Sequence, residues 1–468
     1  ASDREFIRRV YADLAGRLPT ETEVQSFVAS TSPSKRSTTI DSLLASTDFS
    51  THWANDIFAN WACISTSTAS VVEFNRVTQS EIQRDTPMST MVRNLINGAG
   101  PTTTIVNPQG QTLMWGDIWL STFDNYGDTQ QVDQLLESFA GQSAQCGRCH
   151  DHKLTVTGQD DPMWTQDDVY GLYAYVAVNA GSATKVDIAG RRFGVTVPAH
   201  FVADGYANKV DSFVAGTTTP MTAGNTPIAT RRAAFATIFG GSKAFARGTA
   251  HRIFAEVMDP LLDPNNFLAM NLSAVKQTGL LNVLEAQFRT GGYSLKSFLR
   301  LICNSKLYQL TTAGTTVAND KILARRTVRR HHGEVIEKGL YSVTGVAFTA
   351  MNNNFQQQFG YPLRRQEILD RTDQVNIGQA FTLLNGQNAA NGLVKRANSR
   401  PITLANQVTA GTITLTQAIT ILFHEALGRD PSSTELTAIN TSIAGQTPLV
   451  ALEDVSVAIC NTSEFVNR

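Results

Sequence analysis

Apolar residues recur at every third or fourth position through most of this 468-residue chain. That spacing places them on one face of an α-helix. The pattern is clearest in residues 5–17, 39–46, 132–140, 294–308 and 418–429. Strand-like alternation is confined to residues 104–115 and 185–197, in which Gly110 and Gly190 are candidate turn residues. We therefore expect a mainly α-helical protein with short β-hairpins.

A helical unit is repeated near the two ends of the chain. The stretch "VYADLAGRLPTETEV" (residues 10–24) corresponds to "LFHEALGRDPSSTEL" (residues 422–436). In each copy a glycine ends one helix, a proline prevents its continuation, and a capping box opens the next helix. The boxes are Thr20 with Glu23, and Ser432 with Glu435. We interpret the repeat as a packing unit.

The end of the repeated unit predicts where three cysteines lie. Residues 301–310 look like a third copy of this part, and the alignment places Cys303 and Cys460 where the first copy has Leu44. That position belongs to the apolar face of a helix. We predict that both cysteines are core residues that behave as small hydrophobes, and we interpret Cys63 in the same way.

The length of the chain predicts two to three domains, because a single core rarely extends over so many residues. Residues 181–230 are rich in Gly, Thr and Pro and form our expected connection, loop-rich with some β-structure. We expect one helical domain over residues 1–180 and a second over residues 231–468.

Charge and composition narrow the class of partner. The chain has 39 basic and 40 acidic residues, a balance that favours neither nucleic acid nor an anionic membrane surface. Charged residues make up 17%, below the about 25% of typical soluble proteins, which favours an exported protein. No apolar run is long enough for a membrane-spanning helix, and we expect a mature form whose signal peptide is already removed. The basic run at residues 324–332, which includes His331 and His332, predicts a solvated helix face.

The main chemical signal is "CGRCHDHK", residues 146–153. Cys-x-x-Cys-His is the attachment sequence of c-type haem. One helical turn separates Cys146 from Cys149, so their thiols can add to the two vinyl groups of a porphyrin, and His150 then projects onto the iron as proximal ligand. His152 is too close in sequence to reach the opposite side of that iron. We interpret it as a propionate or hydrogen-bond partner of the haem.

A zinc site is the alternative interpretation of the same cluster. The two cysteines and two histidines of residues 146–152 could give a Cys2His2 set, but four ligands within seven residues cannot easily surround one ion tetrahedrally. A redox-active or inert cysteine pair also stays open.

The distal haem ligand is the least determined feature. A second histidine would lower the redox potential, a methionine would raise it, and an empty site would permit small-ligand chemistry. His52 is the preferred candidate and Met163 the next. The other residues considered are His200, His251, His424, Met88, Met91 and Met114.

Several stretches together resemble a known family. Residues 6–24, 42–55, 145–153 and 164–176 resemble the planctomycete-type cytochrome domain PSCyt2 (DUF1549). The partner domain PSD1 (DUF1553) is similar to residues 245–257, 291–310, 325–336, 383–388 and 452–465. The resemblance implies an exported, cytochrome-like protein through Cys146, Cys149 and His150. Residues 154–163 are an insertion relative to that family.

These observations predict an exported mono-haem c-type cytochrome, periplasmic or at the cell surface, whose one covalent haem c transfers single electrons. Its partners would be redox proteins or neighbouring subunits. Two alternatives stay open: a surface scaffold that self-assembles with the haem as a staple, and a haem enzyme of peroxidase type, which needs an acid/base group beside an open distal site.

Overall fold

The computed structural model describes residues 1–64, 68–107, 109–122, 129–142, 172, 175–176, 186–188, 191–193, 228–261, 277–312, 326–346, 353–360, 377–385 and 390–467. The chain forms two compact units. Unit 1 contains Ala1–His52, Cys303–Leu363 and Asp370–Arg468, and unit 2 contains Trp53–Ile302 and Arg364–Leu369. Both are built mainly from helices, which confirms the predicted fold class.

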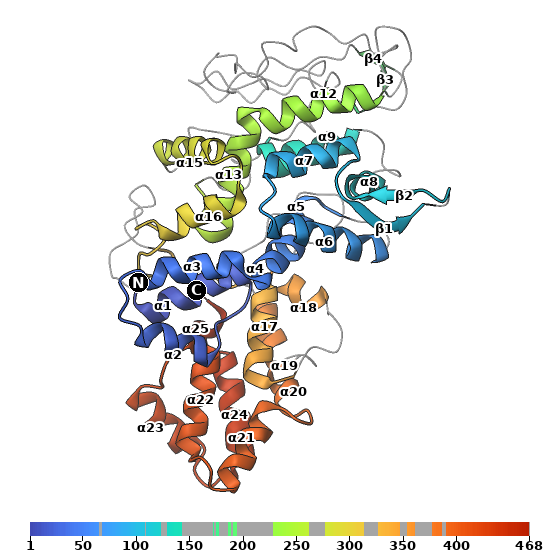
Figure 1. Ribbon diagram of the computed structural model, residues 1–468. Helices are drawn as coiled ribbons and strands as arrows, with labels where there is room; N and C mark the ends of the chain where they lie inside the picture. Colours follow the sequence, from blue (N-terminus) through green and yellow to red (C-terminus); the bar gives the residue numbers. More distant parts are fainter. Residues whose placement is uncertain are drawn as a thin grey trace. The chain divides into compact units, whose positions relative to one another are not determined.

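Unit 1 takes helices from widely separated parts of the chain (Figure 1, blue and orange to red). The earlier ones are α1 (Asp3–Ala15), α2 (Glu21–Ala29), α3 (Lys35–Ala45) and α4 (Thr47–His52). The later ones are α17 (Gly333–Thr344), α18 (Asn353–Gln358), α19 (Ile377–Asn385), α20 (Ala390–Val394), α21 (Arg400–Thr409), α22 (Leu415–Leu427), α23 (Ser433–Ser442), α24 (Pro448–Cys460) and α25 (Ser463–Val466).

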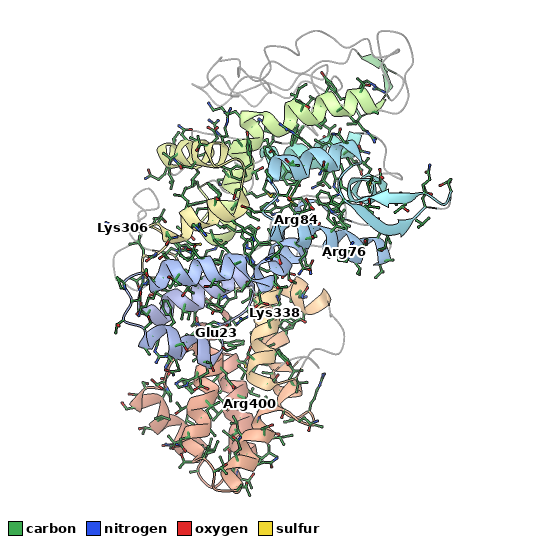
Figure 2. All side chains as sticks on the ribbon, in the orientation of Figure 1. Glu23, Arg76, Arg84, Lys306, Lys338 and Arg400 are labelled. Carbon is green, nitrogen blue, oxygen red and sulfur yellow. The ribbon has the colours of Figure 1, made fainter. Side chains whose placement is uncertain are left out.

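One apolar core joins these segments. Ala12 and Leu18, from the first twenty residues, pack with Leu340 of α17 and Leu422 of α22 in a single buried cluster. Arg400 of α21, labelled in Figure 2, adds an ion pair to Glu425 of α22, with 2.7 Å between the guanidinium and the carboxylate. The core of unit 1 therefore forms only when segments from both ends of the chain pack together.

Unit 2 contains the middle of the chain. Its elements are η1 (Trp53–Phe58), α5 (Ala59–Trp61), α6 (Thr68–Gln83), α7 (Met88–Asn97), β1 (Thr102–Val106), β2 (Thr112–Met114), α8 (Trp115–Ser121), α9 (Thr129–Leu135), η2 (Leu136–Ala140), β3 (Val186–Ile188), β4 (Arg191–Phe193), α12 (Ile228–Gly241), α13 (Lys243–Val257), α15 (Thr278–Thr290) and α16 (Leu295–Asn304), whose last two residues belong to unit 1. α12 and α7 lie side by side (Figure 1).

Aromatic side chains form the centre of unit 2. Trp115 stacks on Phe74 at 5.1 Å and on Phe58 at 6.0 Å between ring centroids. Its indole N–H donates to Oγ1 of Thr78 at 3.0 Å, so the buried ring leaves no polar atom unsatisfied. Phe139 of η2 contacts Phe58 at 6.0 Å and extends this aromatic cluster towards α13.

Both predicted hairpins are confirmed. β1 pairs antiparallel with β2, with an irregular register between Thr102↔Met114 and Val106↔Thr112. β3 pairs antiparallel with β4, and Asp187 lies opposite Arg192. The predicted connection at residues 181–230 lies almost entirely outside the described residues, so the sequential division at 180 and 230 stays a prediction. The compact units follow a different division, because unit 1 combines residues from before and after unit 2.

The repeated unit forms as its sequence predicts. Its first copy comprises α1 to α4 and its second copy comprises α22 to α25. Gly16 and Gly428 end the first helix of each copy in the left-handed conformation, with φ of 63° and 67°. Both capping boxes are present, at Thr20 with Glu23 and at Ser432 with Glu435.

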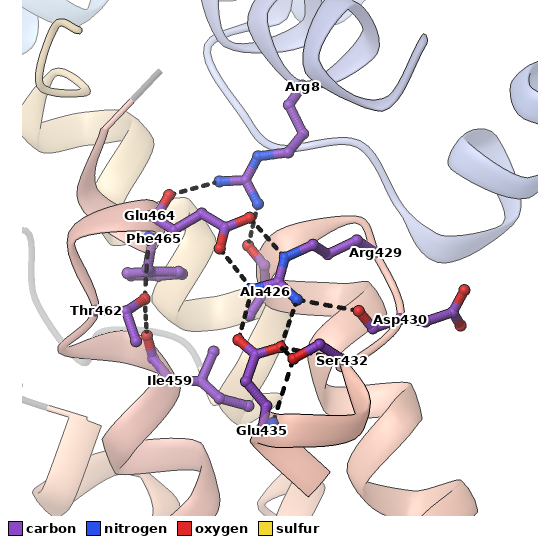
Figure 3. A network of polar contacts seen from close by, with 10 residues as sticks. All are labelled: Arg8, Ala426, Arg429, Asp430, Ser432, Glu435, Ile459, Thr462, Glu464 and Phe465. Carbon is purple, nitrogen blue, oxygen red and sulfur yellow. Dashed lines mark hydrogen bonds and ion pairs between the residues drawn. The ribbon is translucent and has the colours of Figure 1, made fainter. Parts of the chain in front are cut away.

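Each copy also carries an arginine bound by two carboxylates, which the sequence reading missed. Arg17 binds both oxygens of Glu23 at 2.8 and 2.9 Å and Asp48 at 2.7 Å. At the equivalent position in the second copy, Arg429 binds Glu435 at 2.7 and 2.9 Å and Glu464 at 2.7 and 2.8 Å (Figure 3). The signal was the Gly-Arg pair in both copies, with an acidic residue directly before the closing aromatic.

The two copies pack against each other in unit 1. Arg8 of α1 donates to the carbonyl oxygen of Ala426 at 2.9 Å and to that of Glu464 at 3.1 Å (Figure 3). Arg4 donates to the carbonyl of Gly428. These cations meet the carboxyl end of α22, where unpaired carbonyls and the helix dipole favour positive charge.

Among the described helices, none combines the length and the apolar character needed to cross a membrane.

Candidate functional site

The predicted haem cluster lies outside the described residues. Cys146, Cys149, His150, His152 and Met163 all fall in residues 143–171, and their roles stay predictions. The structure does describe the helix that leads into the cluster and several of the candidate distal ligands.

α9 and η2 lead into the cluster, and η2 ends at Gly141 with a φ of 67°. This segment is tied to the end of α5 by two side chains. The hydroxyl of Ser138 donates to the carbonyl oxygen of Trp61 at 2.6 Å, and the amide of Gln134 donates to the same oxygen at 3.1 Å. The chain therefore enters the cluster from a fixed point in the interior of unit 2.

α13 packs directly on the end of η2. Thr249 donates its hydroxyl to the carbonyl oxygen of Phe139 at 3.0 Å. A Cβ at Gly248 would overlap the backbone of Ala140, so the two backbones approach more closely than any other residue allows. This contact places the middle of α13 beside the last described turn before the cysteine cluster.

His251 lies one turn beyond Gly248, on the same side of α13. Arg252, four residues beyond Gly248, has its guanidinium carbon 5.8 Å from the ring centroid of Trp61, so the side of α13 that carries Gly248 and Arg252 faces the α5–η2 region. His251 is 3% exposed. Burial, assisted by the charge of Arg252, lowers the pKa of His251 to about 3, so its imidazole is neutral at physiological pH. Neutral imidazole is the form that binds iron and other metals.

His424 is excluded as an iron ligand by its contacts. Its Nδ1 lies 2.7 Å from a carboxylate oxygen of Glu21, and its Nε2 lies 2.6 Å from one of Asp430. Both ring nitrogens are thus held by carboxylates. His424 is a structural residue that links α22 to α2.

His52 is buried at the end of α4, with 1% of its surface exposed. A Cβ on Gly16 would overlap its ring, so the left-handed glycine and the histidine fit together. A ring nitrogen of His52 and a carboxylate oxygen of Glu334 lie within 4.8 Å of each other, and Nδ1 of His332 lies 3.7 Å from Glu334. These contacts give His52 a role in packing unit 1, and its role as a distal ligand stays a prediction.

The predicted basic helix face at residues 324–332 is wrong for the part that the structure describes. Residues 326–332 are not helical, and His331 and Arg326 are 1% and 2% exposed. Guanidinium groups can be buried when they stack on aromatic rings and donate to carbonyls. Arg326 stacks on Tyr308 at 5.3 Å, and Arg330 donates to the carbonyl oxygen of Phe359 at 3.1 Å.

The cysteines outside the cluster are core residues, as predicted. Cys303 and Cys460 are fully buried, and Cys63 is 6% exposed. Burial raises the pKa of the Cys303 and Cys460 thiols, which keeps them protonated and unreactive.

Two of the three described methionine candidates are core residues. Met88 and Met91 are buried in α7. Met114 is 39% exposed, and its sulfur accepts a hydrogen bond from the hydroxyl of Thr102 at 3.7 Å.

Comparison with known families gives two matches. Residues 1–179 match PSCyt2, described as a protein of unknown function (DUF1549). Residues 232–355 match PSD1, described in the same way (DUF1553). The chain is a PSCyt2 and PSD1 domain protein. No curated protein and no solved structure matches it.

The two matched segments of this PSCyt2–PSD1 protein contribute to the same compact units. In unit 2, η2 of the PSCyt2 segment contacts α13 of the PSD1 segment. In unit 1, Leu18 of the PSCyt2 segment packs in the same core as Leu340 of the PSD1 segment. Each compact unit thus draws on both segments.

Proposed function

We propose that this PSCyt2–PSD1 protein is an exported mono-haem c-type cytochrome that transfers single electrons. Cys146 and Cys149 would hold the haem as thioethers, His150 would be its proximal ligand, and His152 would bind a propionate. When bound, the haem supplies one-electron redox chemistry. The observation that carries the proposal is the Cys-x-x-Cys-His sequence, which follows a helix anchored inside unit 2.

His251 is the described residue best suited to the distal position. It is neutral and buried, and it lies one turn from Gly248, the residue of α13 that contacts the end of η2. His52 and Met163 remain the alternatives predicted from the sequence. His52 is already packed against Gly16 and close to Glu334.

The first experiment is a pyridine haemochrome assay with reduced-minus-oxidised spectra on denatured protein from an exporting host. We expect a c-type α-band that stays with the polypeptide, at one haem per chain. Replacement of both cysteines, Cys146→Ala with Cys149→Ala, should remove it. Absence of haem in correctly exported protein, with zinc bound instead, would overturn the proposal.

The distal ligand is tested separately on haem-loaded protein. His251→Ala should convert a low-spin visible and EPR spectrum to a high-spin one while the haem stays covalently bound. His424→Ala is the matched control and should leave the spectrum low-spin. An unchanged spectrum in His251→Ala, together with a change in His52→Ala or Met163→Leu, would assign the ligand to the residue predicted from the sequence.

A scaffold function is the second candidate, and one contact favours it. The first copy docks through Arg4 and Arg8 onto the helix end of the second copy, a head-to-tail contact between similar units. Contacts of this type can also continue between molecules. Concentration-dependent assembly of the purified protein, measured by light scattering, with a redox-silent haem would support the scaffold over electron transfer.

A further inference from the structure

A cavity of about 280 Å³ lies between α22, α23 and α24 in the second copy of the repeated unit. Its walls are mainly apolar and come from Phe423, Leu427, Ile439, Ile443, Val455 and Ile459. Ligand cavities in proteins begin at about 300 Å³, and benzene fits a cavity of about 150 Å³. The space is therefore sized for a small molecule.

The mouth of this cavity carries an excess of negative charge. Glu435, Glu464 and Asp454 line it, and Arg429 is the single cation among the lining residues. Figure 3 shows Arg429 held between Glu435 and Glu464, so its charge is already engaged by the protein. Arg429 holds the pKa of Glu435 at about 2, and this carboxylate is ionised at neutral pH. Asp454 is exposed at the rim, where it accepts a hydrogen bond from Gln446 at 3.1 Å.

The first copy has an equivalent cavity with different lining. It measures about 420 Å³ and lies between α1, α2 and α3, where Tyr11 and Glu23 take the places of Phe423 and Glu435. The remaining lining is largely hydroxyl groups from Thr22, Ser26, Ser30, Ser32, Thr38 and Thr39. The three-helix arrangement thus forms a cavity in both copies, and the two cavities differ in their lining side chains.

In the first copy, the ammonium group of Lys35 lies at the edge of the cavity. Nζ of Lys35 lies 5.1 Å from the ring centroid of Phe27 and donates to the carbonyl oxygens of Phe27 and Ser30 at 3.3 and 2.9 Å. In the second copy the alignment replaces Lys35 by Ala451, and Thr38 by the acidic Asp454. The second cavity therefore lacks its own ammonium at this position and carries an added carboxylate.

We propose that the cavity between α22, α23 and α24 binds a small apolar molecule that carries a protonated amine. The apolar part lies between Phe423, Ile443 and Ile459, and the ammonium group lies at the rim beside Asp454. Desolvation of the apolar part supplies most of the affinity, and the carboxylate of Asp454 at the rim selects the positive charge. The proposal does not depend on the haem.

The test uses three probes of equal chain length on the full-length protein: octylammonium, octanol and octanoate. Isothermal titration should show one octylammonium per chain, with octanol weaker and octanoate undetectable. Asp454→Asn should weaken octylammonium about tenfold and leave octanol unchanged. The neighbouring Glu453→Gln removes the same charge from α24 outside the cavity lining and should change neither probe.

A blocking variant tests the location. Ala458 is exposed and lines the mouth, so Ala458→Leu narrows the entrance without replacing a buried residue. Octylammonium binding should be lost while the circular dichroism spectrum and the unfolding midpoint stay the same. Equal binding of octanoate, retained binding in Ala458→Leu, equal effects of Asp454→Asn and Glu453→Gln, or no binding to the native protein would each overturn the proposal.

Discussion

The hydroxyl of Tyr308 donates a 2.7 Å hydrogen bond to the carboxylate of Asp13, a residue 295 positions earlier in the chain. Both side chains are buried. Tyr308→Phe removes this donor from a buried carboxylate, and we expect it to lower the free energy of unfolding by roughly 1–3 kcal/mol. Urea denaturation measures the change. Tyr341→Phe, at a 52% exposed tyrosine of α17, is the control and should be close to neutral.

Gly16 combines a left-handed backbone with a close approach to His52. Gly16→Ala should destabilise the protein by more than the backbone cost of about 1–2 kcal/mol, because the added methyl overlaps the imidazole. Gly411→Ala isolates the backbone cost, since Gly411 has a φ of 73° and no atom near its missing Cβ. Equal losses of stability for the two variants would show that the contact with His52 is unimportant.

Gly248 allows α13 to contact the backbone of η2. Gly248→Ala forces these segments apart, and we expect a thermal unfolding midpoint several degrees lower. If His251 ligates the proposed haem, the haem spectrum should also change, because His251 moves with α13. Gly279→Ala in α15 is the control, because no atom lies within 4 Å of the position that its added Cβ would take. This variant should be neutral or slightly stabilising. A Gly248→Ala protein with native stability would contradict the close packing.

Glu73 makes the stability of the protein depend on pH in the acid range. Its carboxylate accepts two hydrogen bonds from Arg76 and one from the backbone N–H of Thr104, all at 2.8 Å. The bonds from Arg76 hold the pKa of Glu73 at about 2, below its value of about 4.3 in an unfolded chain. The unfolded state therefore takes up the proton first as the pH falls. The stabilisation from Glu73 is complete above about pH 5 and is lost as the pH falls towards about 2.

The measurement for Glu73 compares the native protein with Glu73→Gln in urea titrations from pH 7 to pH 2. The native protein should be the more stable at pH 7, and the difference should shrink below about pH 4.5. Glu453→Gln should show no such pH-dependent difference. A constant difference between native and Glu73→Gln over the whole range would contradict the assigned pKa.

Local signals in the sequence predicted the mainly helical fold, several individual helices and both hairpins. Gly16, Gly428 and the two capping boxes act within a few residues of themselves, so their sequence alone determines the helix ends. The burial of Cys303 and Cys460 followed from alignment with Leu44, because equivalent positions in a repeated unit face the same core.

Features that depend on distant partners could not be predicted. Arg326 is buried because its guanidinium stacks on the ring of Tyr308, and no sequence pattern near Arg326 predicts that contact. The composition of unit 1 depends on contacts such as Arg8 with Ala426, which are 418 residues apart. At the candidate site, the sequence offered His251 only as one of several histidines that could be the distal ligand. The contact of α13 with η2 is the reason we prefer it among the described histidines.

Unit 2 is inserted between the parts that build unit 1. During synthesis α1 emerges 418 residues before the carbonyl of Ala426 that its Arg8 will cap. At about 5–20 residues per second, that interval lasts roughly 20–80 s. Throughout it the apolar face of α1 has no partner from α22, and unit 2 can complete its own core first. A chain interrupted before α22 would expose this face, which makes residues 1–52 the expected binding site for a chaperone on the nascent protein.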